Sequence, residues 1–407
     1  MVKQNASGQY YHEPMYIEVF NKNFERVAVC DNYESLIWTD RYNEPGDFEL
    51  YFGMNKDLLK IYVPDYYLVS PDSEYTMIIE DIKVTTDLEG GDHLIVTGRS
   101  LESILYRRIV WNQITVSGNF VNAIYKVLKQ NVIEPKLAKR AIPEFYWNKD
   151  TTDESIKALR IDETQFTGDV VYEVLKRLCD QFDVGFSIKR NDETGKFVFK
   201  LYYGTDRSYK QSENPFVVFS PDFDNIVTSD YTEKKSGYCN VTLVAGEGKS
   251  NPNSENGSSS ISTNEADRKT LEVGDVNSSG LDRRELYTDA RDLSSKIEGD
   301  PEDADSNQSG QNEERTMSTE EYNNLLKNRG LEKLKEVEIE KTFDGQVEAT
   351  QLYRYGEHFS MGDYCELVNQ YGMETRVKIV EYIHSESTSG IEEYPTFKVV
   401  EEEEEGE

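Results

Sequence analysis

Alternating hydrophobic and polar positions dominate the first hundred residues and predict short β-strands. Phe48, Leu50 and Phe52 share one face of such a strand, and Leu94 and Val96 share a face of another. Turn signals rich in Asn, Pro, Gly and Asp separate these runs. Because several short strands follow one another at spacings of roughly ten residues, we predict a first small β-barrel domain over residues 13–99.

From residue 100 the hydrophobic spacing changes to that of helices. Residues 120–128 and, more strongly, 171–182 place apolar side chains on one helical face. Asp169 is positioned to cap the second helix and Gly185 to end it. Two strands are expected between this glycine and residue 203. This mixture predicts an α/β insert domain over residues 100–220.

The remaining third of the chain changes composition twice. Strands return at 221–246, and residues 247–317 are so rich in Gly, Ser, Asn and Glu that we predict a mostly disordered acidic loop, with a helix at 281–293. A capping box at Ser318 begins another helix, and alternation resumes in a second β-barrel domain that completes residues 318–400. Residues 1–12 are predicted to form a flexible arm and 401–407 an acidic tail. The expected fold class is therefore α+β and β-rich.

The net charge and the cysteine content indicate which classes of function are disfavoured. The formal net charge of −32 across 407 residues disfavours gripping of nucleic acid phosphates, although DNA could pass by without binding. Four widely spaced cysteines contain no C-x-x-C pair and are expected as free thiols. No apolar run is long enough for a membrane span, and the polar first residues lack a signal core, so synthesis in the cytosol is expected.

No arrangement of reactive side chains predicts catalysis. The histidines, His12, His93, His358 and His384, form no i, i+3 or i, i+4 pair, and His12 and His93 are expected to be solvated or lightly hydrogen-bonded. Nucleophile-elbow and phosphate-loop motifs are also absent. We assign no catalytic residue, no cofactor and no metal ligand, and we expect the chain not to be an enzyme.

Two charged motifs have competing interpretations. Asp303, Asp305, Asn307 and Glu314 have the spacing of a calcium loop, but Gln308 replaces the glycine that its turn requires, which favours an acidic loop without metal. The basic pairs Arg107-Arg108 and Arg283-Arg284 are better explained by ion pairs within the protein or with a neighbouring subunit than by nucleic acid binding.

Four passages, in order along residues 15–400, resemble the tail-associated hub, or baseplate hub, family of long-tailed, siphovirus-like bacteriophages and prophages. They are residues 38–50 (WTDRYNEPGDFEL), 96–111 (VTGRSLESILYRRIVW), 280–292 (GLDRRELYTDARD), and 359–364 with 394–397 (FSMGDY and YPTF). The resemblance implies two small β-barrels joined by insert domains. In that family, three subunits form a ring in which six barrels give pseudo-sixfold symmetry.

The resemblance also implies function and partners. It implies a structural homotrimer at the tail tip of the virion, assembled in the host bacterial cytoplasm. A distal tail or tail-tube protein is expected above it and a trimeric tip or fibre protein below it, with genomic DNA only as passing cargo. The acidic loop departs from the family pattern, as does the glutamate run that takes the place of a fibre or wall-cutting region.

Two other interpretations remain open from the sequence. The chain could be a host-surface glycan-binding module of the tail tip, since it is β-rich and contains 27 Tyr and 17 Phe. A hydrolase is the third interpretation, although no nucleophile or metal constellation supports it. The sequence does not separate a contractile from a non-contractile tail.

Overall fold

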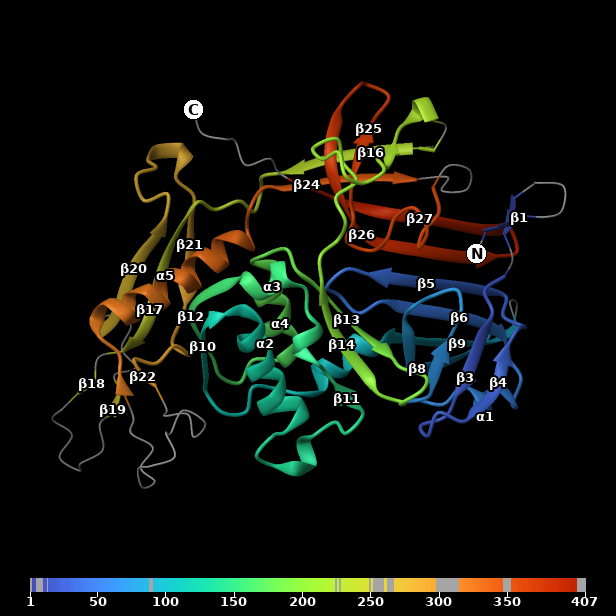
Figure 1. Ribbon diagram of the computed structural model, residues 1–407, viewed down its shortest axis with the longest axis horizontal. Helices are drawn as coiled ribbons and strands as arrows, with labels where there is room; N and C mark the ends of the chain where they lie inside the picture. Colours follow the sequence, from blue (N-terminus) through green and yellow to red (C-terminus); the bar gives the residue numbers. More distant parts are fainter. Residues whose placement is uncertain are drawn as a thin grey trace.

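One large, mostly antiparallel sheet runs through much of the molecule (Figure 1). Its strand order is β16-β24-β27-β26-β5-β6-β9-β8-β7-β3-β4. The computed structural model describes residues 2–4, 10–12, 14–87, 91–223, 225–226, 228–248, 250–251, 260–261, 267–297, 315–346 and 353–400. Short strand pairs outside the larger units are β1 (Val2–Gln4) with β2 (Tyr10–His12), β18 (Ser250–Asn251) with β19 (Ser260–Ile261), and β22 (Lys296–Ile297) with β23 (Arg315–Thr316).

The N-terminal half of the large sheet forms a first β unit. Its inward-facing positions, including Trp38, Leu50 and Phe52, are fully buried in one core, as the alternation predicts. In the part of the chain that is described, no hydrogen-bonded pairing joins β4 back to β5, so closure into a barrel stays a prediction. The elements are β3 (Ile17–Phe20), β4 (Arg26–Cys30), β5 (Ser35–Arg41), β6 (Asp47–Gly53), α1 (Leu58–Ile61), β7 (Tyr67–Val69), β8 (Thr76–Asp87) and β9 (Gly91–Ser100).

The other half of the sheet forms a second β unit with its own core around Phe219, Phe359 and Phe397. Strand β26 pairs with β5 from Glu381↔Arg41 to Glu386↔Leu36, so main-chain hydrogen bonds join the two units into one sheet. The elements are β15 (Val218–Phe219), η5 (Pro221–Phe223), β16 (Thr228–Lys234), β24 (Glu340–Gln346), β25 (Tyr364–Val368), β26 (Glu374–Ser387) and β27 (Gly390–Val399).

An α/β insert lies between the two β units in sequence and has the largest core cluster. The stripes predicted at 120–128 and 171–182 form α2 and α4. Asn119 caps α2, whereas Asp169 does not cap α4 and accepts a bond from the Thr167 N–H. The elements are η1 (Leu101–Arg107), β10 (Ile114–Asn119), α2 (Phe120–Leu128), η2 (Lys129–Ile133), η3 (Ala138–Arg140), β11 (Phe145–Tyr146), η4 (Lys149–Thr151), α3 (Glu154–Ala158), β12 (Arg160–Phe166), α4 (Val171–Asp180), β13 (Gly185–Arg190) and β14 (Phe197–Tyr202).

A small lateral unit lies on the opposite side of the insert from the first β unit (Figure 1). A three-stranded sheet, in the order β20-β17-β21, packs against the long helix α5, whose Ser318 capping box is formed as predicted. Val244, Val273 and Leu326 are buried between sheet and helix. The elements are β17 (Val241–Gly248), β20 (Arg268–Gly274), η7 (Gly280–Asp282), β21 (Glu285–Asp289) and α5 (Thr319–Lys335).

The lateral unit corrects the helix predicted at 281–293. Residues 285–289 form strand β21, which pairs in parallel with β17, and Leu281 is 98% exposed, so no apolar helical face exists there. Tertiary pairing outweighs the helix propensity of Leu, Arg and Glu in this segment.

The predicted disordered loop at 247–317 is also wrong in part. Its residues 267–297 are built into the lateral unit, where Val273, Ala290 and Leu293 are buried. The segment itself is poor in apolar residues, but α5 supplies the other side of the core. The returning strands predicted at 221–246 divide as well, since β16 joins the large sheet and β17 the lateral sheet. The acidic tail at 401–407 lies outside the described residues.

Candidate functional site

The turn between β5 and β6, residues 42–46, holds the insert against the sheet. The Tyr42 hydroxyl donates to the Asp183 carbonyl at 2.9 Å. Asn43, in the left-handed region at φ 52°, donates from Nδ2 to the Val184 carbonyl at 2.9 Å and accepts from the Phe186 N–H at 2.9 Å. Asn tolerates this backbone region better than most residues. The side chains of the turn therefore form hydrogen bonds with the backbone at the start of β13.

A second connection runs from the same turn through buried polar side chains. The Gly46 N–H donates to Ser100 Oγ at 2.8 Å, and that hydroxyl donates to Glu102 Oε2 at 2.5 Å. Glu102 Oε1 accepts the Ile188 N–H at 2.7 Å. Burial raises the pKa of Glu102, although its hydrogen bonds act in the opposite direction. These contacts connect the turn, β9 and β13.

The second β unit contacts this turn from the other side. Arg41 pairs with Glu381 at 2.6 Å and with Asp47 at 2.9 Å. Lys378, whose side chain is only 4% exposed, pairs with Asp183 and lies 4.0 Å from the centre of the Tyr42 ring. Burial lowers the pKa of Lys378, while Asp183 opposes that shift.

The passage at 359–364 packs on the same turn. Gly362 has φ 87°, and a Cβ added there would lie 2.7 Å from the Tyr42 ring, so glycine is required for close approach. The next residue, Asp363, accepts from the Thr205 N–H at 2.7 Å and from Arg207 at 2.9 Å. Three of the four resembling passages thus converge at one inter-unit junction.

The fourth passage, 280–292, lies in the lateral unit and has a separate structural role. Arg283 pairs with Glu272 and Glu285, while Asp292 pairs with the buried Arg329 of α5 at 2.8 Å. These pairs fix β21 to its neighbours.

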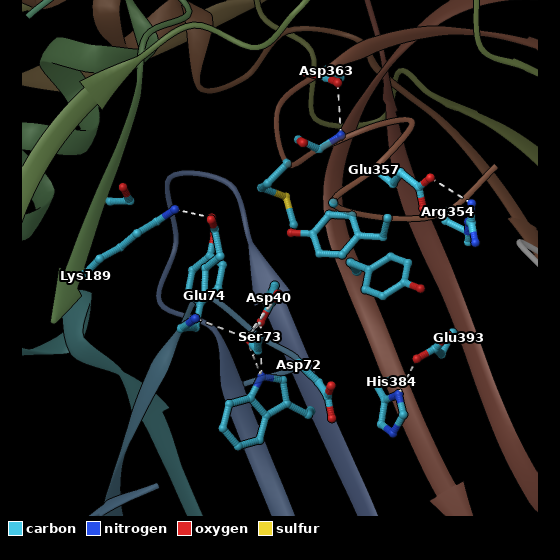
Figure 2. A pocket seen from close by; sticks show the side chains of 18 of the residues that line it. Asp40, Asp72, Ser73, Glu74, Lys189, Arg354, Glu357, Asp363, His384 and Glu393 are labelled. Atoms are coloured by element: carbon cyan, nitrogen blue, oxygen red, sulfur yellow. Dashed lines mark hydrogen bonds and ion pairs between the residues drawn. The ribbon is translucent and has the colours of Figure 1, made fainter. Parts of the chain in front are cut away.

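A cleft of about 740 Å³ opens beside the junction, between the first β unit, the insert and the second β unit (Figure 2). Buried Asp40 lies on its wall, where its Oδ1 accepts from Trp38 Nε1 and Ser73 Oγ, both at 3.1 Å. Burial raises the pKa of Asp40 to about 7 despite these bonds. Charged side chains from the insert and from the 354–363 loop line the opposite walls, including Lys189, Arg354 and Glu357.

A buried histidine network lies at the edge of this cleft. His384 is bonded at Nε2 to Glu386 at 2.5 Å and at Nδ1 to Glu393 at 2.7 Å. Glu386 also accepts the Met15 N–H and the Tyr33 hydroxyl, which belong to the first β unit. Burial disfavours the charge on His384, but the two carboxylates outweigh it and raise its pKa. The network therefore joins both β units.

His93, His358 and the two basic pairs make contacts within the chain. His358 accepts one bond from the Arg354 N–H, whereas His384 is buried and bonded at both ring nitrogens. His93 stacks on Tyr51. Both basic pairs act within the chain, as predicted, since Arg107 pairs with Asp65 and Arg283 with Glu272.

The four cysteines are free thiols, and three of them are buried. The calcium-like motif at 303–314 lies outside the described residues. Among the residues that are described, no cluster of three or more His, Cys, Asp or Glu could hold a metal ion. No helix in the described part of the chain is long and apolar enough to cross a membrane.

The junction residues were missed as a site by reasoning from the sequence. The 43–46 turn was visible as a turn, but its partners lie about 140 residues away in the chain, as the Asn43–Val184 bond illustrates. The only signal was that three separate passages resembled one family, which hints at a shared role without showing contact.

Comparison with known proteins identifies the family. The model of the family described as Siphovirus ReqiPepy6 Gp37-like protein matches residues 16–393. Among solved structures, the tail protein from Neisseria meningitidis MC58 is 12% identical with a TM-score of 0.50, covering 95% of this chain and 97% of that chain. The 43 kDa tail protein of prophage MuSo2 from Shewanella oneidensis is 12% identical with a TM-score of 0.52, covering 95% and 98%.

No curated protein matches the sequence. At about one identical residue in eight, the two structural matches demonstrate a common fold over nearly the whole of both chains. The family match, which covers most of the sequence, demonstrates kinship. The chain therefore belongs to the Siphovirus ReqiPepy6 Gp37-like protein family and shares its fold with these two tail proteins.

Proposed function

We propose that this chain is a structural protein of the phage tail that forms a homotrimeric hub at the distal end of the tail tube. The observation that carries the proposal is the single sheet that passes through two β units of one chain. A trimer that binds a tube of sixfold symmetry must offer six similar contact units. Each of its three chains therefore needs two such units. Three chains would then present six units to the tube above and a threefold face to the tip or fibre protein below.

Unpaired strand edges provide a way to join the copies. Among the described residues, β16 pairs only with β24, and residues 80–87 of β8 pair only with β9. Exposed edges of this kind invite pairing with another chain. We propose that the edge of β8 in one copy pairs with β16 in the next. This head-to-tail contact closes a ring when the rotation between copies is 120°, and the ring then surrounds a pore.

The acidic composition suits a pore that conducts DNA. Carboxylates facing the lumen would repel phosphates, so that the genome slides through without binding. On this proposal the protein acts only as a structural component, with no catalytic role of its own. Mobility-shift measurements with duplex DNA at low salt are expected to show no retention, and peptidoglycan zymography is expected to show no clearing.

The mass of the purified protein tests the proposal. Light scattering coupled to size-exclusion chromatography is expected to give three times the chain mass of 46.9 kDa. A trimer supports the hub. A stable dimer, or a monomer that persists both at high concentration and after mixing with its tail-tube neighbour, contradicts it.

A further inference from the structure

The cleft beside the junction has the size of a ligand site and is open to solvent on one side. At about 740 Å³ it lies within the range of pockets that hold small ligands. Three separate parts of the chain build its walls: β5 with the 72–75 loop, strands β13 and β14, and the 354–363 loop with β26 and β27 (Figure 2). Because folded elements surround it on several sides, its shape is set by the packing of the units.

Most of the charges that face the cleft are compensated by ion pairs within the protein, whereas Asp72 and Lys200, which carry opposite charges, form no ion pair among the described residues. Glu74 pairs with Lys189, Glu357 with Arg354 at 2.8 Å, and Asp363 with Arg207 at 2.9 Å. A free cation or anion therefore gains little by entering. Each carboxylate oxygen nevertheless has further lone pairs, and each ammonium or guanidinium group has several N–H donors. These groups can exchange hydrogen bonds with neutral hydroxyls.

The remaining lining is aromatic and hydroxylic. Tyr355 and Tyr382 stack with their ring centroids 4.0 Å apart and 13° between their planes, so each ring covers one face of the other, and Tyr382 is 9% exposed. Tyr203, which is 39% exposed, presents the most accessible aromatic side chain of the lining. Among the described residues that line the cleft, Met15 and Met361 are the only aliphatic side chains, so an acyl chain or an apolar peptide would find little matching surface.

We propose that this cleft binds a short neutral oligosaccharide. A pyranose ring has apolar C–H faces that pack on tyrosine rings and a rim of hydroxyls that both donate and accept hydrogen bonds. The aromatic side chains of the lining can pack on the C–H faces of the sugar. The ion-paired side chains can hydrogen-bond to its hydroxyls without requiring a charge on the ligand. This inference is independent of the hub role, since the cleft lies within one chain.

The test uses the full-length protein on a printed array of neutral and acidic oligosaccharides. It is followed by saturation-transfer NMR titrations with maltotriose, triacetylchitotriose and, as a cationic comparison, trilysine. Signal from at least one neutral saccharide is expected, with a dissociation constant of about 1 mM or tighter.

Variants place the binding in the cleft. Ser360→Trp should fill it and weaken saccharide binding at least tenfold, and Tyr203→Ala should weaken it several-fold. Tyr146→Ala is the matched control, because Tyr146 is 49% exposed and does not line the cleft. The inference is overturned if no neutral saccharide binds, if trilysine binds more tightly, or if binding survives in both cleft variants. Trimer mass is measured alongside, so that loss of the hub and loss of saccharide binding are scored separately.

Discussion

At the scale of single residues, the junction depends on glycines that let two stretches of backbone approach closely. A Cβ at Gly46 would lie 2.3 Å from the Thr39 carbonyl oxygen, and one at Gly362 would meet the Tyr42 ring. Neither constraint could be derived from the sequence, where Gly46 was visible only as a turn residue. The requirement for glycine comes from atoms that other strands bring to the turn.

Gly46→Ala is therefore expected to destabilise the protein by about 1–3 kcal/mol, because a backbone carbonyl cannot move aside easily. Thermal melting of the purified variant measures the effect. Gly237→Ala is the control, since a Cβ there meets nothing within 4 Å. Equal melting temperatures for the two variants would contradict the junction geometry.

The His384 network predicts a dependence of stability on pH. The pKa of His384 is raised, so its contribution is complete below its unfolded value of about 6.5 and is lost as pH rises through the folded pKa. Burial disfavours ionisation of Glu393, but its bond with His384 lowers the pKa to about 2, and the pKa of Glu386 is lowered too. Their contribution is present above about pH 4.5 and is lost as pH falls.

Together these groups stabilise the contact between the β units most between about pH 4.5 and 6.5. His384→Gln should melt at a lower temperature than the unmodified protein at pH 6. The two proteins should converge as pH rises above the His384 pKa. Melting curves across pH 5–9 check this, and a constant difference between the two proteins over that range would show that His384 carries no charge in the fold.

At the scale of elements, the sequence correctly predicted the features that depend on residues close together in the chain. The α2 stripe and the Ser318 capping box were readable because side chains three and four residues apart create them. Strand β21 was mistaken for a helix because its conformation is imposed by β17, more than 40 residues earlier. The lateral unit was not predicted for the same reason. The apolar side chains that pack on its sheet belong to α5, which lies later in the chain.

Ser318→Ala should cost about 1 kcal/mol by removing the hydroxyl that accepts the Glu321 N–H. Because α5 covers the lateral sheet, the loss should also increase proteolysis between β17 and α5. Limited trypsin digestion and thermal melting measure both effects. Ser212→Ala, in an exposed loop, is expected to leave both unchanged, and an unchanged S318A would mean that the cap contributes nothing.

At the scale of the whole molecule, one sheet joins the two β units, and the edges of β8 and β16, each with a single strand partner in the described part of the chain, are the basis of the expected assembly. This arrangement was only partly predictable. The resemblance implied two β units, but the β5–β26 pairing that unites them spans about 340 residues of sequence and leaves no local pattern.

Val84→Lys tests the edge-to-edge contact. Val84 is 46% exposed on the part of β8 that, among the described residues, pairs only with β9, and a lysine at a strand edge opposes pairing with another chain. The trimer of this variant should dissociate at a protein concentration at least tenfold higher than the trimer of the unmodified protein. This corresponds to a loss of about 1.4 kcal/mol in the free energy of association. Analytical ultracentrifugation measures this, with Val276→Lys, 45% exposed in the lateral unit, as control. If only the control weakens the trimer, β8 is not at the interface.

Cryo-electron microscopy of intact virions tests the proposed trimeric hub. Three copies of this chain are expected in a ring at the distal end of the tail tube, with six β units around a pore and with β8 of each copy beside β16 of the next. Density that places this chain in the capsid, or at the tail in any number other than three copies per ring, would contradict it.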